Sequence, residues 1–148
     1  MHRNRRVVSS LFMAGIAFIV SGCVGVNTAP GGKPLYDRLG GKTAIIAVVD
    51  HLVANVAADS RINGLFATTD ISKLKGHLVD KVCMVTGGPC TYKGRDMKTT
   101  HAGMKITNGD FDALVEDLVA ALDKFKVPAH EKGELLGLLR PMKKDILE

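Results

Sequence analysis

The sequence has little excess charge once its N-terminus is set aside. Of its 20 Lys and Arg residues, three lie among the first 22 positions, which leaves 17 against 15 Asp and Glu. A protein that binds nucleic acid usually presents a strongly basic surface. The formal charge of +5 for the whole chain therefore does not predict a nucleic-acid partner.

Alternation of polar and apolar residues, which is typical of half-buried β-strands, is missing after position 35. Apolar residues there recur every three or four positions, as on one face of an α-helix. We expect an all-α domain, with Asp70 capping its second long helix and Thr107 or Asn108 its third. The long helices are expected at about 42–58, 70–85, 107–125 and 128–146, with shorter helical turns at 35–39 and 97–104. In the last long helix, Leu135, Leu138, Leu139, Met142 and Ile146 are expected to face inward.

The long apolar run at 7–20 follows Arg3, Arg5 and Arg6 and is shorter than a normal spanning helix. It ends in Ser21-Gly22-Cys23, and small residues directly before a cysteine resemble a bacterial lipobox. We expect residues 1–22 to be a lipoprotein signal peptide, residues 23–34 a tether lipidated at Cys23, and residues 35–148 a single domain.

Acyl chains on Cys23 would hold the domain on a membrane surface. The chain is then expected in a bacterial cell envelope, facing the periplasm, and Val24 after the cysteine weakly favours the outer membrane. The alternatives are a plain signal peptide and an uncleaved anchor. Removing 22 of 148 residues leaves 126, which is enough for one hydrophobic core.

Cysteine is scarce, since only Cys83 and Cys90 follow Cys23. Disulfides persist in exported proteins, and a separation of seven residues across a helix end can be bridged. The alternative is two separate thiols. A bridge would tie the end of the second long helix to the loop that follows it.

The segment 87–106 is unusually irregular for so compact a domain. It contains glycines, a proline, many polar residues and one histidine, His101. Long irregular segments in small domains usually serve a functional site or are mobile.

The landmarks along the chain resemble those of group I truncated globins, in which four helices pack two over two around a haem. The motifs that carry this resemblance are Leu35-Tyr36-Asp37-Arg38-Leu39-Gly40-Gly41, Leu65-Phe66, Leu74-Lys75-Gly76-His77, Gly87-Gly88-Pro89, Tyr92-x-Gly94-x-x-Met97, Thr100-His101-Ala102-Gly103, Ile106-Thr107 and Phe111. The resemblance covers nearly all of the chain from Leu35 to Glu148.

The resemblance implies that the chain binds haem b and that His101 is the proximal ligand of its iron. A neutral imidazole is the usual axial ligand in globins. Phe66 matches an aromatic residue that packs on the haem face, and Met97 matches a methionine on the proximal side. The sequence has no Cys-x-x-Cys-His motif, so covalent attachment of the c type is not expected. His51 and His130 are expected to face solvent.

The distal side departs from better-known family members, which often place a tyrosine and a glutamine near bound oxygen. The matching positions here are Val53 and Leu78, and Leu74 adds a third apolar group. Bound oxygen would lack those two hydrogen-bond donors. His77 matches a histidine that coordinates the iron in cyanobacterial and algal relatives, and its alternative is a solvent-facing position beside the haem edge.

Three basic residues, Lys75, Arg95 and Lys98, are placed where their side chains could pair with the haem propionates. Exposed charges of this kind are often only solvated. Pairing with a propionate is therefore predicted separately for each of the three residues, and it depends on where the side chain lies.

Three functions remain open for such a protein. The first is binding of O₂, NO or CO by a monomer with a distal histidine gate, with oxidation of NO to nitrate as an associated reaction. The second is electron transfer or redox sensing by a haem held by two histidines, with an unknown electron donor. The third is a haem-free helical binding module. The sequence offers no dedicated catalytic acid, base or nucleophile, so turnover would rest on haem and an external reductant.

Overall fold

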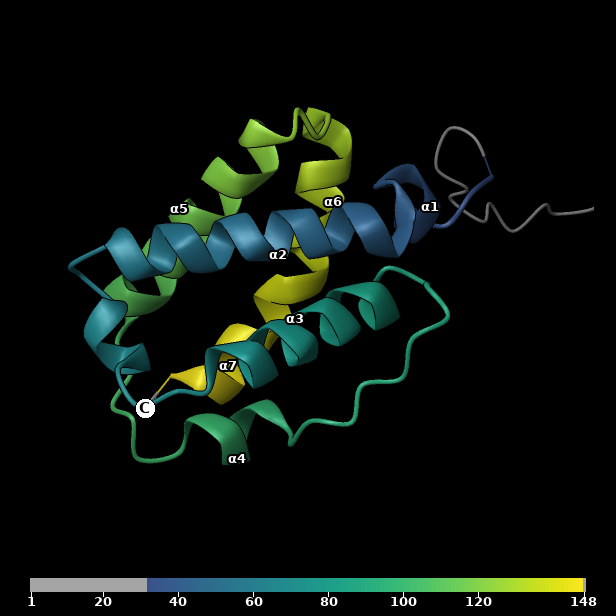
Figure 1. The fold of residues 1–148 in the computed structure, drawn as a ribbon. Helices are drawn as coiled ribbons and strands as arrows, with labels where there is room; N and C mark the ends of the chain where they lie inside the picture. The colour runs from purple at the N-terminus through teal and green to yellow at the C-terminus, as the bar shows by residue number, and fades with distance from the viewer. Residues whose placement is uncertain (1–31, 148) are drawn as a thin grey trace, which may run out of the picture.

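The computed structural model describes residues 32–147, which are helical and contain no strand (Figure 1). The predicted all-α class is therefore confirmed. The elements are α1 (Leu35–Arg38), α2 (Gly41–Ala58), η1 (Asn63–Phe66), α3 (Ile71–Val85), α4 (Met97–His101), α5 (Asn108–Lys124), α6 (Ala129–Leu139), η2 (Arg140–Met142) and α7 (Lys143–Ile146). The predicted signal peptide and Cys23 lie outside the described residues.

Helix α2 is the centre of the fold, because it packs against both α3 and α5. Its buried side chains Ile45, Val49, Leu52 and Val56 recur at helical spacing along one stripe. By length and composition alone α2 could also cross a membrane. Here its apolar stripe is covered by the neighbouring helices, as in the core of a folded domain.

Side chains close the N-terminal ends of three helices. Asp70 accepts a hydrogen bond from the backbone N–H of Lys73 at 3.0 Å at the start of α3. Thr107 and Asp110 form a reciprocal capping box at the start of α5. Asp96 caps α4. The caps predicted at Asp70 and Thr107 are confirmed.

Cys83 and Cys90 are joined by a disulfide, with their Cα atoms 5.7 Å apart. Cys83 is fully buried in a cluster formed with Ile45, Val49 and Val79. The chain turns at Thr86 and Gly87, and a Cβ on the following Gly88 would overlap the Cys83 sulfur. The bridge thus ties the loop after α3 to the body of the domain.

The prediction of one continuous helix over 128–146 is wrong. Helix α6 ends at Leu139, and the chain passes through the short η2 before α7 begins. Pro141 explains the break, since it lacks the backbone N–H that would continue the hydrogen bonding of the α-helix and its ring clashes with the carbonyl one turn earlier. Leu138 was expected to face inward and is 40% exposed.

An arginine fixes α1 to α6. Arg38 of α1 forms ion pairs with Glu131, at 2.8 Å, and with Glu134. Its guanidinium holds the pKa of Glu131 below the ordinary value. This pairing places α1 beside the C-terminal half of the domain.

Candidate functional site

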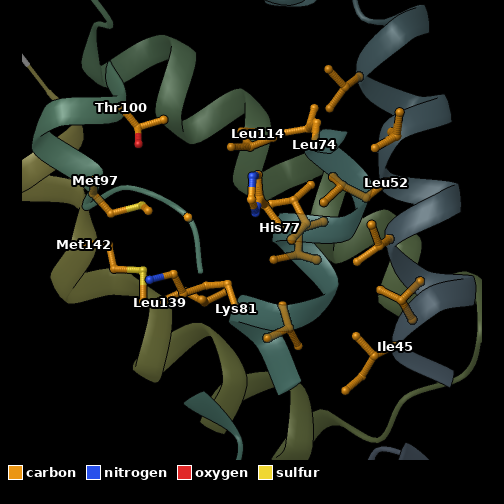
Figure 2. Close-up of a pocket in the computed structure, with 18 of the residues that line it drawn as sticks. Ile45, Leu52, Leu74, His77, Lys81, Met97, Thr100, Leu114, Leu139 and Met142 are labelled. Carbon is orange, nitrogen blue, oxygen red and sulfur yellow. The ribbon is translucent and has the colours of Figure 1, made fainter. Parts of the chain in front are cut away.

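A cavity of about 760 Å³ lies among α2, α3, α4, α5 and the C-terminal elements. Most of its lining is aliphatic or aromatic, and two histidines reach it, His77 from α3 and His101 from α4. Figure 2 shows Met97 and Met142 on the side opposite Leu52 and Ile45 of α2. Cofactor pockets commonly measure about 300 to 1,000 Å³ and have this apolar character.

His101 is held by its own helix. Its Nδ1 lies 2.7 Å from the backbone oxygen of Met97, and a carbonyl oxygen can only accept, so Nδ1 carries the proton. In the neutral ring, Nε2 then carries the lone pair. Histidines that bind a metal commonly donate their other ring N–H to a carbonyl in this way.

The short helix α4 owes its position to contacts at both ends. Asp96 accepts hydrogen bonds from the backbone N–H of Thr99 at 2.8 Å and from its hydroxyl at 2.7 Å. These bonds hold the pKa of Asp96 below the ordinary value. Helix α4 also packs against α7. The arrangement fixes a five-residue helix that would be marginal alone.

The part of the cavity lined by α2 and α3 is mostly apolar, with His77 as its one imidazole. Val53, Leu74 and Leu78 all line it, as does His77. In Figure 2 the His77 ring projects into the open centre of the cavity. His77 thus supplies a nitrogen ligand from this part of the cavity. Val53 and Leu78 stand where better-known family members often have a tyrosine and a glutamine, and they supply no hydroxyl or amide.

Phe66 and Met97 also line the cavity, as does Arg95. Lys75 does not. Its ammonium group pairs with Asp50 of α2 at 2.8 Å. Lys98 lines a separate cavity of about 170 Å³ that also touches His101. The residues marked by the sequence thus converge on one cavity, except for two of the three basic side chains.

Three lining lysines, Lys73, Lys81 and Lys93, were not marked by the sequence. Tyr92, Phe111 and Met142 also line the cavity, and the sequence marked them only as motif or inward-facing residues with no role at the site. Lys73 and Lys81 lie four residues before and after His77, so a helical wheel centred on His77 would have found them. Tyr92 lies in the loop after α3, and periodicity carries no information about its position.

The donor set itself limits the kind of metal that could bind. Within 32–147 no three or more His, Cys, Asp or Glu residues are grouped to hold a metal ion. The two histidines of the cavity therefore fit a metal whose remaining ligands come from an organic cofactor. The apolar walls and basic rim suit a flat apolar macrocycle that carries acidic groups.

The family model for bacterial-like globins matches residues 34–148. This chain is a group 1 truncated haemoglobin. It is 39% identical over 113 residues to the group 1 truncated hemoglobin GlbN of a Nostoc species, covering 76% of this chain and 96% of the relative. With the GlbN of Mycolicibacterium paratuberculosis it shares 36% identity over 112 residues, covering 76% and 82%.

Solved truncated haemoglobins show the same fold. The Fe(III) form from Tetrahymena pyriformis gives a TM-score of 0.75 at 34% identity, covering 78% of this chain and 98% of that chain. A 2/2 hemoglobin from Synechococcus, in the cyanomet state with covalently attached heme, gives 0.73 at 30% identity with the same coverage. The family and the two-over-two fold predicted from the sequence are confirmed.

Proposed function

We propose that this truncated haemoglobin binds haem b non-covalently in the 760 Å³ cavity and uses it to bind diatomic gases reversibly, with His101 as proximal ligand. The observation that carries the proposal is the hydrogen bond from His101 Nδ1 to Met97. It fixes the tautomer in which Nε2 can bind iron. Haem, when bound, would supply an iron that can bind imidazole nitrogens and diatomic gases, and His101 and His77 are the residues that would hold it.

The remaining lining has the chemistry that haem requires. Apolar side chains, among them Phe66 and Met97, surround the space for a flat ring. Arg95, Lys73 and Lys93 supply positive charge for two propionates. Charge-assisted hydrogen bonds of this kind are stronger than neutral ones.

His77 is proposed as the distal gate. Its ring projects into the cavity (Figure 2), while the neighbouring Val53, Leu74 and Leu78 provide no hydrogen-bond donor. The His77 imidazole would therefore compete with gases for the iron, and its turning away would open the site to them.

Absorption spectra of the ferric and ferrous protein test both histidines. The mature chain without Cys23 would be reconstituted with haem and compared with His77→Ala, His101→Gly and, as a control, His51→Ala. His51 lies on α2 and contacts Phe125. We expect low-spin bands in the parent and the control, high-spin bands in His77→Ala, and loss of stable haem in His101→Gly that added imidazole restores.

Each part of the proposal can fail separately in this experiment. High-spin bands in the parent, unchanged in His77→Ala, would refute the gate and leave a simple gas binder. Normal spectra in His101→Gly would refute the proximal assignment. Absence of haem uptake by the parent would favour a haem-free helical module.

Electron transfer is the second candidate, because a haem held by both His77 and His101 needs no external ligand to work. The presence of two histidines from separate helices in one cavity favours it. Very slow displacement of His77 by CO together with fast electron exchange would support it over gas binding. Oxidation of NO to nitrate by this protein would require a separate electron donor, since the cavity supplies none.

We also propose that the haem domain is anchored in the bacterial cell envelope through acyl chains on Cys23, facing the periplasm. The support comes from the sequence, in which basic residues, an apolar run and small residues directly precede that cysteine. Several acyl chains together give stable membrane attachment, whereas one is marginal. The domain itself is proposed to be a monomer.

A further inference from the structure

Tyr92 belongs to the loop between α3 and α4, and its ring lies against two residues of α3. Its centroid is 5.9 Å from that of His77, with the two rings inclined at 66°. The ammonium group of Lys81, one turn after His77, lies 3.6 Å from the centroid of the same ring. An edge contact and a cation over the face are both favourable to an aromatic ring.

The loop side holds the ring equally firmly. The Tyr92 hydroxyl donates a hydrogen bond to the backbone oxygen of Arg95 at 2.9 Å. Burial raises the pKa of Tyr92, so the hydroxyl keeps its proton and remains a donor. A Cβ on Gly94 would overlap the ring, which means that the ring lies across the Gly94 backbone.

The disulfide adds a covalent attachment close to this ring. Cys90 precedes Tyr92 by two residues, and its partner Cys83 follows Lys81 by two residues on α3. His77, Lys81 and Cys83 thus secure one short loop segment to one helix. The contact that the structure gives the His77 imidazole in this arrangement is the edge-on one with Tyr92.

We propose that Tyr92 is a positioning residue that keeps the His77 ring turned into the cavity, and that Lys81 and the Cys83–Cys90 bridge hold Tyr92 in place for this task. The inference rests on the proposed haem site. Without the Tyr92 ring, His77 has more room to turn outward, and its competition with gases weakens.

The test is a double-mutant cycle on the haem-loaded protein, with CO association rates measured by stopped flow. The four proteins are the parent, Tyr92→Leu, His77→Ala and the double variant. An aromatic pair contact predicts an increase of about three- to tenfold for Tyr92→Leu in the parent. In the His77→Ala background the same substitution should change the rate less than about twofold, because Tyr92 would no longer have a His77 ring to position. Such a non-additive result shows that the two residues are coupled, whereas additive effects would show that they act independently. Equal changes in both backgrounds would overturn the proposal.

The ferric spectrum provides a second readout and separates this inference from the gate itself. Tyr92→Leu should lower the low-spin fraction, as should Gly94→Ala, which displaces the ring without removing it. Tyr92→Phe keeps both ring contacts and loses the hydrogen bond to Arg95, so its low-spin fraction should lie between those of the parent and Tyr92→Leu. An unchanged spectrum in His77→Ala would refute coordination by His77, while the CO cycle would still decide whether Tyr92 acts through it.

Reduction of the disulfide tests the covalent attachment. Cys90→Ser should raise the CO association rate in the same direction as Tyr92→Leu and by a smaller factor, because the ring contacts remain. The parent treated with a disulfide reductant should match Cys90→Ser, and the reductant should not affect that variant. Unchanged CO association rates in both cases would mean that the disulfide does not help to hold Tyr92 in place.

Discussion

Methyl groups of Val53, Leu74 and Leu78 line the face of the cavity that carries His77. Bound O₂ accumulates partial negative charge, and a hydrogen bond to a charged acceptor contributes about 1.5 to 3 kcal/mol. Once His77 is removed, none of these three side chains can donate such a bond. Fast O₂ release is therefore expected from His77→Ala.

Adding a donor should reverse that behaviour. In the His77→Ala background, Leu78→Gln should slow O₂ dissociation by about tenfold or more, which is the kinetic equivalent of one such bond. The rate would be measured by displacement with CO. Leu78→Met, which conserves volume without a donor, should leave it near that of the background. A rate unaffected by Leu78→Gln would mean that this side chain does not reach the gas.

Individual residues differ in how well the sequence placed them. His77, His101, Phe66 and Met97 were marked by their motifs, and all four line the cavity. Lys75 was marked as well, yet it pairs with Asp50 on a different helix. A long flexible side chain takes whichever partner the tertiary fold provides, and spacing along one helix cannot identify that partner.

Helix α4 shows how an element supports the site. It has five residues, so it depends on its Asp96 cap and on packing against α7. Asp96→Ala should loosen His101 and increase the rate of haem loss about two- to tenfold, as expected for loss of one N-cap. Transfer of haem to an apoglobin acceptor measures this rate. Thr107→Ala, which removes the cap of α5, is the matched control and should lower thermal stability with a smaller effect on haem loss.

The same cap predicts a pH dependence with a definite sign. The pKa of Asp96 is lowered in the folded protein, chiefly by the hydrogen bond from the Thr99 side chain. The contribution of the ionised Asp96 to the stability of α4 is complete above the ordinary carboxyl pKa. It is lost as the pH falls through the lowered pKa of the folded protein. Haem loss should therefore accelerate less on acidification in Asp96→Ala than in the parent. Identical acid profiles would assign the acid sensitivity to other groups.

On the scale of the whole molecule, the cavity lining within residues 32–147 runs from Leu39 to Ile146. Because this part of the chain carries the proposed haem site, anchoring at Cys23 and haem binding should be separable. Cys23→Ala in the full-length chain should move the protein out of the membrane fraction and leave its haem spectrum unchanged. Radiolabelled fatty acid would mark the parent only. Equal labelling or equal membrane association of the two proteins would refute an acyl anchor at Cys23.

The sequence by itself determined the helical class, most helix boundaries, the family and the histidine proposed to bind iron. These depend on local features, namely apolar periodicity, capping side chains and motifs of fixed spacing. Tertiary structure decided where α6 gives way to η2 and α7, which partner Lys75 takes, and how Tyr92 reaches His77. Each of these depends on the path of a loop or on contacts between separate elements, and distances of that kind are set by packing of the whole chain.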